Sequence, residues 1–233
     1  MQTGVATKSG RSNFVAIRQG DADDPLVLSY LGLRKAVGII GLALPIVLIA
    51  GKVILQGGGI ESSISCYYYT DMGNVFVGSL CAIGVFLLSC RGYDIRDAVA
   101  GRLACVFAVG VALFPTSPCP SSPPEAAFIS KIHWSCAALL FATLAYFCLA
   151  LFTETDPSKP RTQRKQMRDV VYRVCGWAIV LCIVLIGVIK LLPIAGDALH
   201  SFSPVFWLES AAVIAFGIAW LTKGEAILKD QQG

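Results

Sequence analysis

Charged side chains are scarce in this sequence. Only 15% of its 233 residues are Asp, Glu, Lys or Arg, whereas 55% are hydrophobic. An ordinary soluble domain carries about 25% charged residues, so this composition excludes a typical soluble globular protein. The sequence instead predicts an integral membrane protein, in which most side chains face lipid or other helices.

Motifs typical of several enzyme and cofactor classes are also lacking. The two histidines, His133 and His200, belong to no HExxH or HxxxH pair that would place two metal ligands on one helix face. The sequence has no phosphate-binding glycine loop, no CxxCH haem-attachment motif and no convincing internal repeat. No nucleic-acid-binding motif is present either, so we expect membrane lipids as partners and no nucleic acid.

Long hydrophobic runs are what the sequence does have. A spanning helix needs about 20 mostly apolar residues, and alternating barrel strands are only about 10 residues long. The predicted fold class is therefore all-α, a polytopic six-transmembrane-helix bundle over 36–222. We expect a polar N-terminal tail over 1–35, without the apolar core of a signal peptide, and a short C-terminal tail over 223–233. The six candidate runs are 36–56, 72–90, 96–114, 127–152, 171–192 and 204–222.

Basic residues are distributed unevenly between the predicted loops. Lys and Arg in short loops stay on the cytoplasmic side of a membrane. All but three of the nineteen Lys and Arg residues fall in or beside the two tails and the second and fourth loops. The fourth loop also predicts a basic helical extension of the fifth run. This pattern predicts a multi-pass protein of the cell (inner or plasma) membrane with both termini cytoplasmic.

The opposite, outer side collects the unusual polar residues. Lys131 and His133 open the fourth run, and Glu209 interrupts the apolar segment "PVFWLESAAVIAFG". An ionised carboxylate on a spanning helix is costly and needs a partner. We therefore expect an outward-facing polar cavity that binds a lipid headgroup or a small polar ligand. The expected ligand-binding residues are Glu61, Tyr69, Asp71, Lys131, His133, Lys190 and Glu209.

Structural roles are an alternative for each of these residues. His133 lies close enough to the membrane surface to be an interfacial histidine that is hydrogen-bonded to a loop carbonyl. Lys131 and Lys190 can extend to the headgroups, and the tyrosines Tyr67 to Tyr69 fit an aromatic belt. Glu209 is equally compatible with a structural ion pair to Lys190 or Lys131.

Two further functions use the same residues. In a membrane-embedded lipid hydrolase or transferase, His133 and Glu209 would be acid/base groups and Ser65 a nucleophile. No cofactor is expected, although Zn²⁺ could be held by His133, His200 and Asp71. In a proton-coupled transporter, Glu209 would be the coupling carboxylate.

Cysteines and small residues suggest how the bundle is held together. Only Cys66 and Cys119 are predicted outside the membrane, where an oxidising compartment permits a disulfide between loops one and three. Small side chains recur at every fourth residue of the third run and predict close helix packing; they are Ala100, Ala104, Ala108 and Ala112. Pro45 predicts a kink in the first run.

Two places in the sequence carry a resemblance to a known group. "GIESSIS" follows the first run, and "LFP" precedes a polar loop and "HWSCAALLFATLAYF". In their order these motifs resemble the six-span Frag/DRAM-like membrane proteins and a related bacterial family of unknown function. That resemblance implies a lipid-linked role. The chain is more remotely similar to a membrane hydrolase group that includes alkaline ceramidases, but it lacks that group's seventh span and HxxxH pair.

Overall fold

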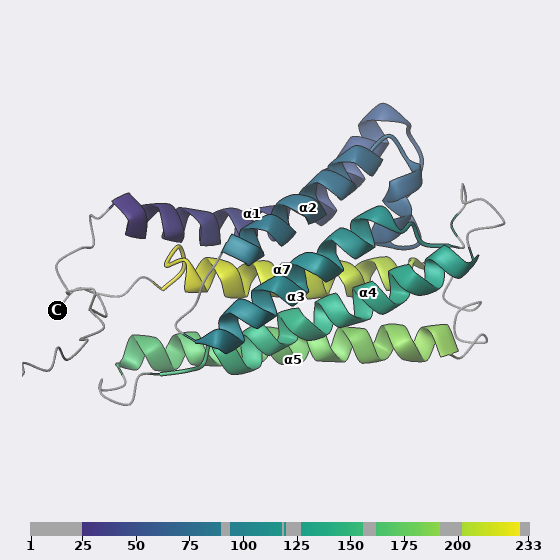
Figure 1. Cartoon of the computed structure of the whole chain (residues 1–233). Coiled ribbons are helices and arrows are strands. Elements are labelled where there is room, and N and C mark those ends of the chain that lie inside the picture. The colour runs from purple at the N-terminus through teal and green to yellow at the C-terminus, as the bar shows by residue number, and fades with distance from the viewer. Residues whose placement is uncertain are drawn as a thin grey trace, which may run out of the picture.

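The computed structural model describes residues 25–89, 94–117, 119, 127–155, 162–191 and 202–228. All regular elements in these ranges are helical, and Figure 1 shows them running alternately in opposite directions along one bundle. The long helices are α1 (Pro25–Leu55), α2 (Gly73–Ser89), α3 (Ile95–Leu113), α4 (Ala127–Tyr146), α5 (Gln163–Leu191) and α7 (Pro204–Lys223). The short 3-10 helix η1 (Ile64–Tyr69) precedes α2, and the π-helical turn η3 (Phe147–Leu151) extends α4.

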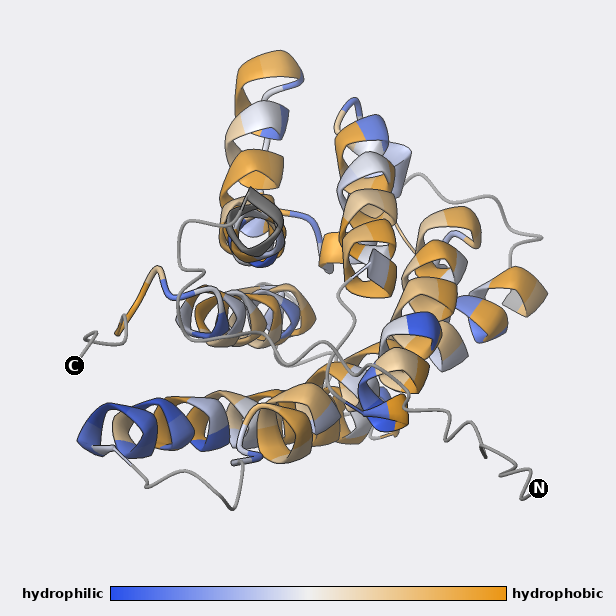
Figure 2. Ribbon diagram, turned by 60° about the vertical axis from the view of Figure 1, so that its left-hand side comes forward, coloured by the Kyte–Doolittle hydropathy of each residue, from blue (hydrophilic) through white to orange (hydrophobic). Residues whose placement is uncertain are grey.

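Four of these helices are long and apolar enough to cross a membrane by length and composition. They include the segments Tyr30–Leu55, Phe128–Leu151, Gln163–Leu191 and Pro204–Lys223, whereas α2 is apolar but shorter. Large apolar side chains such as Trp177 and Val106, each 64% exposed, point away from the bundle. Figure 2 shows hydrophobic residues along most of the helix lengths. Such exposed apolar surface fits contact with lipid and agrees with the predicted membrane class.

Two helices begin earlier than the hydrophobic runs predicted. Helix α1 starts at Pro25, within the segment expected to be a polar tail, because proline is well suited to the first helical position. Helix α5 starts at Gln163, and its polar first turns include an ion pair between Lys165 and Asp169 at i,i+4 spacing. The expected basic extension of this helix is confirmed. Hydropathy alone marks the apolar part of a helix, so it misses such polar ends.

Small residues allow close contacts between neighbouring helices. The four alanines of α3 are all buried, as their spacing predicted, and α2 packs against this helix at Gly84 and Gly101. On α1, Gly38 faces α7, and a Cβ added at Gly217 would lie 2.9 Å from the Gly38 carbonyl oxygen. Pro45 lies inside α1, which changes direction in its second half in Figure 1.

The bundle has two chemically different ends. One end contains η1, the start of α2 and α4 and the end of α1 and α3, and we call it the η1 end (Figure 1). The other contains the start of α1 and α5 and the end of α7, with Arg34, Lys165, Arg168 and Lys223, and we call it the basic end. Three lysines do not belong to the tails or to the second and fourth loops, and they lie towards the η1 end. They are Lys52, Lys131 and Lys190.

Candidate functional site

The segment between α1 and α2 folds into the mouth of the bundle as η1. Ser63 caps this helix, and its hydroxyl accepts a hydrogen bond from the Cys66 N–H at 3.2 Å. At the other end, the Thr70 hydroxyl donates to the Tyr67 carbonyl at 2.8 Å. Serine and threonine hydroxyls commonly fix short turns in this way. Ile64 to Tyr67 are consequently buried, although they belong to a polar connection.

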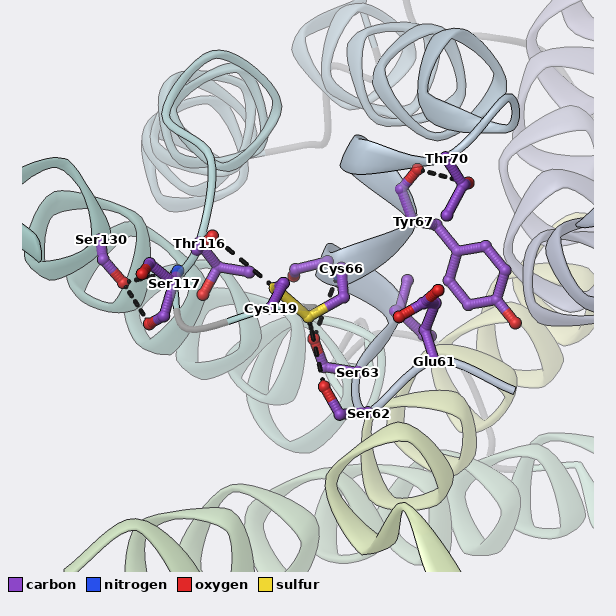
Figure 3. Close-up of a disulfide and its surroundings, with 12 residues drawn as sticks. Glu61, Ser62, Ser63, Cys66, Tyr67, Thr70, Thr116, Ser117, Cys119 and Ser130 are labelled. Atoms are coloured by element: carbon purple, nitrogen blue, oxygen red, sulfur yellow. Dashed lines mark hydrogen bonds between the residues drawn. A yellow bond between two sulfur atoms is a disulfide. The ribbon is translucent and has the colours of Figure 1, made fainter. Parts of the chain in front are cut away.

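A disulfide between Cys66 and Cys119 joins η1 to the connection after α3 (Figure 3). Their Cα atoms are 5.7 Å apart, and the two residues are 53 positions apart in the sequence. The hydroxyls of Ser62 and Ser63 contact the Cys66 sulfur at 3.3 and 3.4 Å. The link between the two loops that the sequence permitted is therefore present in the structure.

His133 connects three segments at this end. Its Nδ1 lies 2.6 Å from the Phe114 carbonyl oxygen, and its Nε2 lies 3.0 Å from the Ser65 hydroxyl. A carbonyl oxygen only accepts, so Nδ1 carries the proton, and Nε2 of the neutral ring accepts from Ser65. His133 is 2% exposed and Ser65 is 8% exposed. The expected loop carbonyl is found, and so is a Ser–His pair with the orientation of a nucleophile and its base.

Glu209 binds the backbone of the same short helix. Its Oε2 accepts a hydrogen bond from the Ile64 N–H at 2.6 Å, and the Ser65 amide also interacts with the carboxylate. The Phe206 N–H donates to the Ser62 carbonyl at 3.2 Å, so α7 holds the η1 segment at two places. Among the described residues, no cation lies within ion-pair distance of Glu209. Backbone amides are thus the hydrogen-bond partners of Glu209, while Lys190, considered from the sequence, acts on the carboxylate through its charge without forming an ion pair.

The other expected ligand-binding residues are distributed around this cluster. Glu61 forms an ion pair with Lys52 at 2.5 Å, a partner that the sequence analysis missed. Lys131 is exposed, and the Lys190 Nζ lies 5.3 Å from the centre of the Trp134 ring. The Tyr69 ring packs edge-on against Tyr68, with ring centroids 5.2 Å apart. Lys190 and Tyr69 therefore have structural contacts of the kind expected for an interfacial belt.

Asp71 lies at a pocket beside η1. The pocket has a volume of about 540 Å³. It lies between η1, the start of α2 and the end of α3 and is lined by Tyr68, Thr70, Asp71, Gly73, Asn74, Val77, Ala112 and Leu113. The lining therefore offers one carboxylate, Asp71, among uncharged polar and apolar groups.

The zinc ligands considered as a possibility from the sequence are not brought together in the described part of the chain. No group of three His, Cys, Asp or Glu side chains suited to a metal occurs there, and His200 lies outside the described residues. Both ring nitrogens of His133 are engaged with Phe114 and Ser65. Metal ligation by His133 would require one of these hydrogen bonds to break, so its present geometry does not fit the ion.

Several polar contacts at this end were not anticipated. The Ser130 hydroxyl lies 2.9 Å from the Ser117 N–H and 2.8 Å from the Ser117 carbonyl. The Trp134 indole N–H donates to the Thr116 hydroxyl at 3.0 Å. These contacts fasten the connection after α3 to α4. The only sequence signal for them was a Ser- and Thr-containing segment beside the start of a helix.

Comparisons of the chain with protein-family models, curated proteins and solved structures find no match.

Proposed function

We propose that the chain is a six-span membrane protein with the η1 end outside and both termini cytoplasmic. The helix directions support this arrangement because each long helix described returns the chain to the opposite end. The disulfide supports it because such bonds persist in oxidising compartments. The concentration of cations at the basic end agrees with the positive-inside rule.

We further propose that the pocket beside η1 binds a lipid headgroup or a small polar ligand. The observation that carries this proposal is the position of Asp71 in a pocket of about 540 Å³. Helix η1, which forms one wall, is fixed by the disulfide, His133 and Glu209. A site with restrained walls loses little entropy when a ligand binds. The resemblance to Frag/DRAM-like proteins, with its lipid-linked implication, points in the same direction.

The lining residues favour a ligand that carries an amine. The Asp71 carboxylate can accept charge-assisted hydrogen bonds, and the Tyr68 ring can contact an ammonium group through its face. Asn74 and Thr70 provide further polar atoms on the same pocket. A headgroup of the ethanolamine type combines these features with a position at the membrane surface.

Asp71→Asn tests this proposal. Removing the charge-assisted interaction should weaken binding of phosphatidylethanolamine about ten- to hundredfold, because such hydrogen bonds contribute about 1.5–3 kcal/mol. Binding is measured by native mass spectrometry of the detergent-purified protein during lipid titration. Glu225→Gln, a carboxylate-to-amide change beyond α7, is the matched control and should bind like the original protein.

A second variant blocks the pocket without changing charge. Asn74→Leu adds an apolar side chain at the pocket wall and should also reduce binding. Unchanged phosphatidylethanolamine binding in both Asp71→Asn and Asn74→Leu would refute the proposed ligand site.

A second candidate function is acyl transfer or hydrolysis of a lipid ester or amide. The specific observation in its favour is the 3.0 Å contact between the Ser65 hydroxyl and His133 Nε2. The Phe114 carbonyl fixes the histidine tautomer that can accept the serine proton. Ser65 would be the nucleophile and His133 the base, while Glu209 would act through the backbone of Ile64 and Ser65.

A further inference from the structure

Positively charged side chains from three helices converge at the basic end of the bundle. Arg34 lies on α1, Lys165 and Arg168 lie in the first two turns of α5, and Lys223 is the last residue of α7. The Lys223 ammonium interacts electrostatically with each of the other three cations. The start of α1, the start of α5 and the end of α7 lie at the same end of the bundle in Figure 1.

Packing around Phe152 sets the positions of the two lysines. The Lys223 Nζ lies 5.2 Å from the centre of the Phe152 ring, and the Lys165 Nζ donates to the Phe152 carbonyl at 3.1 Å. Phe152 is only 3% exposed, and its ring contacts Tyr172 and Trp220 at centroid distances of 5.2 Å. Because this aromatic cluster is buried, both ammonium groups are held beside a fixed part of the core.

Arg34 reaches the same region through a close approach of α1 to the end of α7. A Cβ added at Gly224 would lie 3.2 Å from the Arg34 Cβ. The Arg34 Nη2 donates to the Tyr30 hydroxyl at 2.8 Å, and its guanidinium lies 4.2 Å from the centre of that ring. Its Nε is buried and has no hydrogen-bond partner among the described residues. Arg34 is thus positioned by packing but retains donor capacity.

Among the described residues, three cations and one carboxylate, Asp97, act on the charge of Lys223. Asp169 is engaged in the ion pair with Lys165. Several like charges near a low-dielectric region repel one another unless a counter-charge is present. An anion bound among these side chains would supply that counter-charge.

We propose that Arg34 and Lys223 bind a phosphate group at the basic end, carried by an anionic membrane lipid or by a soluble molecule. A guanidinium presents paired N–H donors that match phosphate oxygens, and an ammonium adds a compact charge. The side chains lie at the ends of helices that can span the membrane, where lipid headgroups are found. This site is separate from the ligand pocket at the η1 end and does not depend on it.

The double variant Arg34→Gln/Lys223→Gln tests the site in the full-length, detergent-purified protein. Binding of phosphatidic acid and of phosphatidylcholine is measured by native mass spectrometry, and inorganic phosphate is added as a competitor. Each removed cation should weaken phosphatidic acid binding about fivefold, so the double variant should bind roughly 25-fold more weakly. Phosphatidylcholine binding should stay the same. Competition by millimolar phosphate would assign the site to a soluble phosphate, whereas its failure to compete would assign it to the lipid.

Arg102→Gln is the matched control because it removes an exposed cation of α3 that is not part of the proposed site. An equal loss of phosphatidic acid binding in Arg102→Gln would show general charge attraction and overturn the proposal. Binding by the double variant that equals that of the original protein would also overturn it. If the double variant does not fold, as judged by circular dichroism, Lys223→Gln alone and the charge-conserving Arg34→Lys provide the comparison. Lys223→Gln should bind phosphatidic acid about fivefold more weakly, and Arg34→Lys should retain most of the binding.

Discussion

Ser65 is the residue at which the polar contacts of the η1 end meet. Its hydroxyl lies against His133, while its backbone amide interacts with Glu209. The neighbouring Cys66 is covalently joined to Cys119. One position in η1 is therefore linked to α4, α7 and the connection after α3. Such a network can stabilise the fold, or it can activate Ser65 as a nucleophile. Only a nucleophilic Ser65 would react with a serine-directed reagent.

We expect Ser65 to react with a fluorophosphonate probe if the second candidate function is correct. Ser65→Ala should abolish labelling, and His133→Asn should reduce its rate by about 10²–10⁴-fold because the general base is lost. Labelling is followed by mass spectrometry of the modified peptide. A chain that is not labelled at Ser65 would exclude the serine nucleophile.

Ser62→Ala is the control for this experiment. Ser62 lies in the same segment, but its hydroxyl contacts the Cys66 sulfur instead of a base, so its removal should leave labelling unchanged. Ser65→Ala should also lower the free energy of unfolding by about 1–3 kcal/mol, because the buried His133 Nε2 loses its donor. A thermal shift without any probe labelling would indicate a structural role alone.

At the scale of elements, glycines decide how closely α1 and α7 approach. The position of a Cβ on Gly217 would be 2.9 Å from the Gly38 carbonyl oxygen and 3.0 Å from the Leu42 N. These neighbours are backbone atoms that cannot rotate away. In a membrane, where lipid is as apolar as the helices, such close packing is a main source of association.

Gly217→Ala should therefore destabilise the bundle. We expect a loss of about 1–3 kcal/mol, the usual cost of overpacking a close contact, measured as a lower midpoint of thermal unfolding in detergent. Gly78→Ala on α2 is the matched control, since nothing lies within 4 Å of the added Cβ. A Gly217→Ala midpoint equal to that of Gly78→Ala would contradict this account of α1–α7 packing.

At the scale of the whole molecule, the disulfide and the basic residues lie at opposite ends. The Cys66–Cys119 bond belongs to the η1 end, and Arg34, Arg168 and Lys223 belong to the other. An oxidising exterior would preserve the disulfide at the η1 end. The basic residues at the other end would keep that end in the cytosol. The proposed orientation places the disulfide on the outer side of the membrane.

An impermeant reductant followed by an impermeant maleimide should label Cys66 and Cys119 in intact cells. Labelling is detected by mass spectrometry, with Cys66→Ser/Cys119→Ser as the variant that should lose it. Cys182→Ser, which removes a buried thiol from α5, should leave the labelling as it was. Labelling that requires prior membrane permeabilisation would reverse the proposed orientation.

The sequence predicted the helices better than it predicted the site. Hydropathy summed over about 20 residues located all six long helices of the described chain, with the earlier starts of α1 and α5 as the main differences. The buried alanines of α3 followed from their spacing. By contrast, Glu209 was expected to need a partner, with a lysine or a ligand as the alternatives, and the structure gives it the Ile64 amide. An amide exposed by a short 3-10 helix leaves no pattern in the sequence.

The sequence by itself determined that this is a helical membrane protein with one basic side, because apolar length and loop charge are local properties of the chain. Only the tertiary structure decided that Ser65 contacts His133, that Glu61 pairs with Lys52 and that the tyrosine segment folds inward. Those contacts depend on how each helix is rotated about its axis and on how the loops return over the bundle. Both are set by packing among residues far apart in the chain, which hydropathy and spacing do not encode.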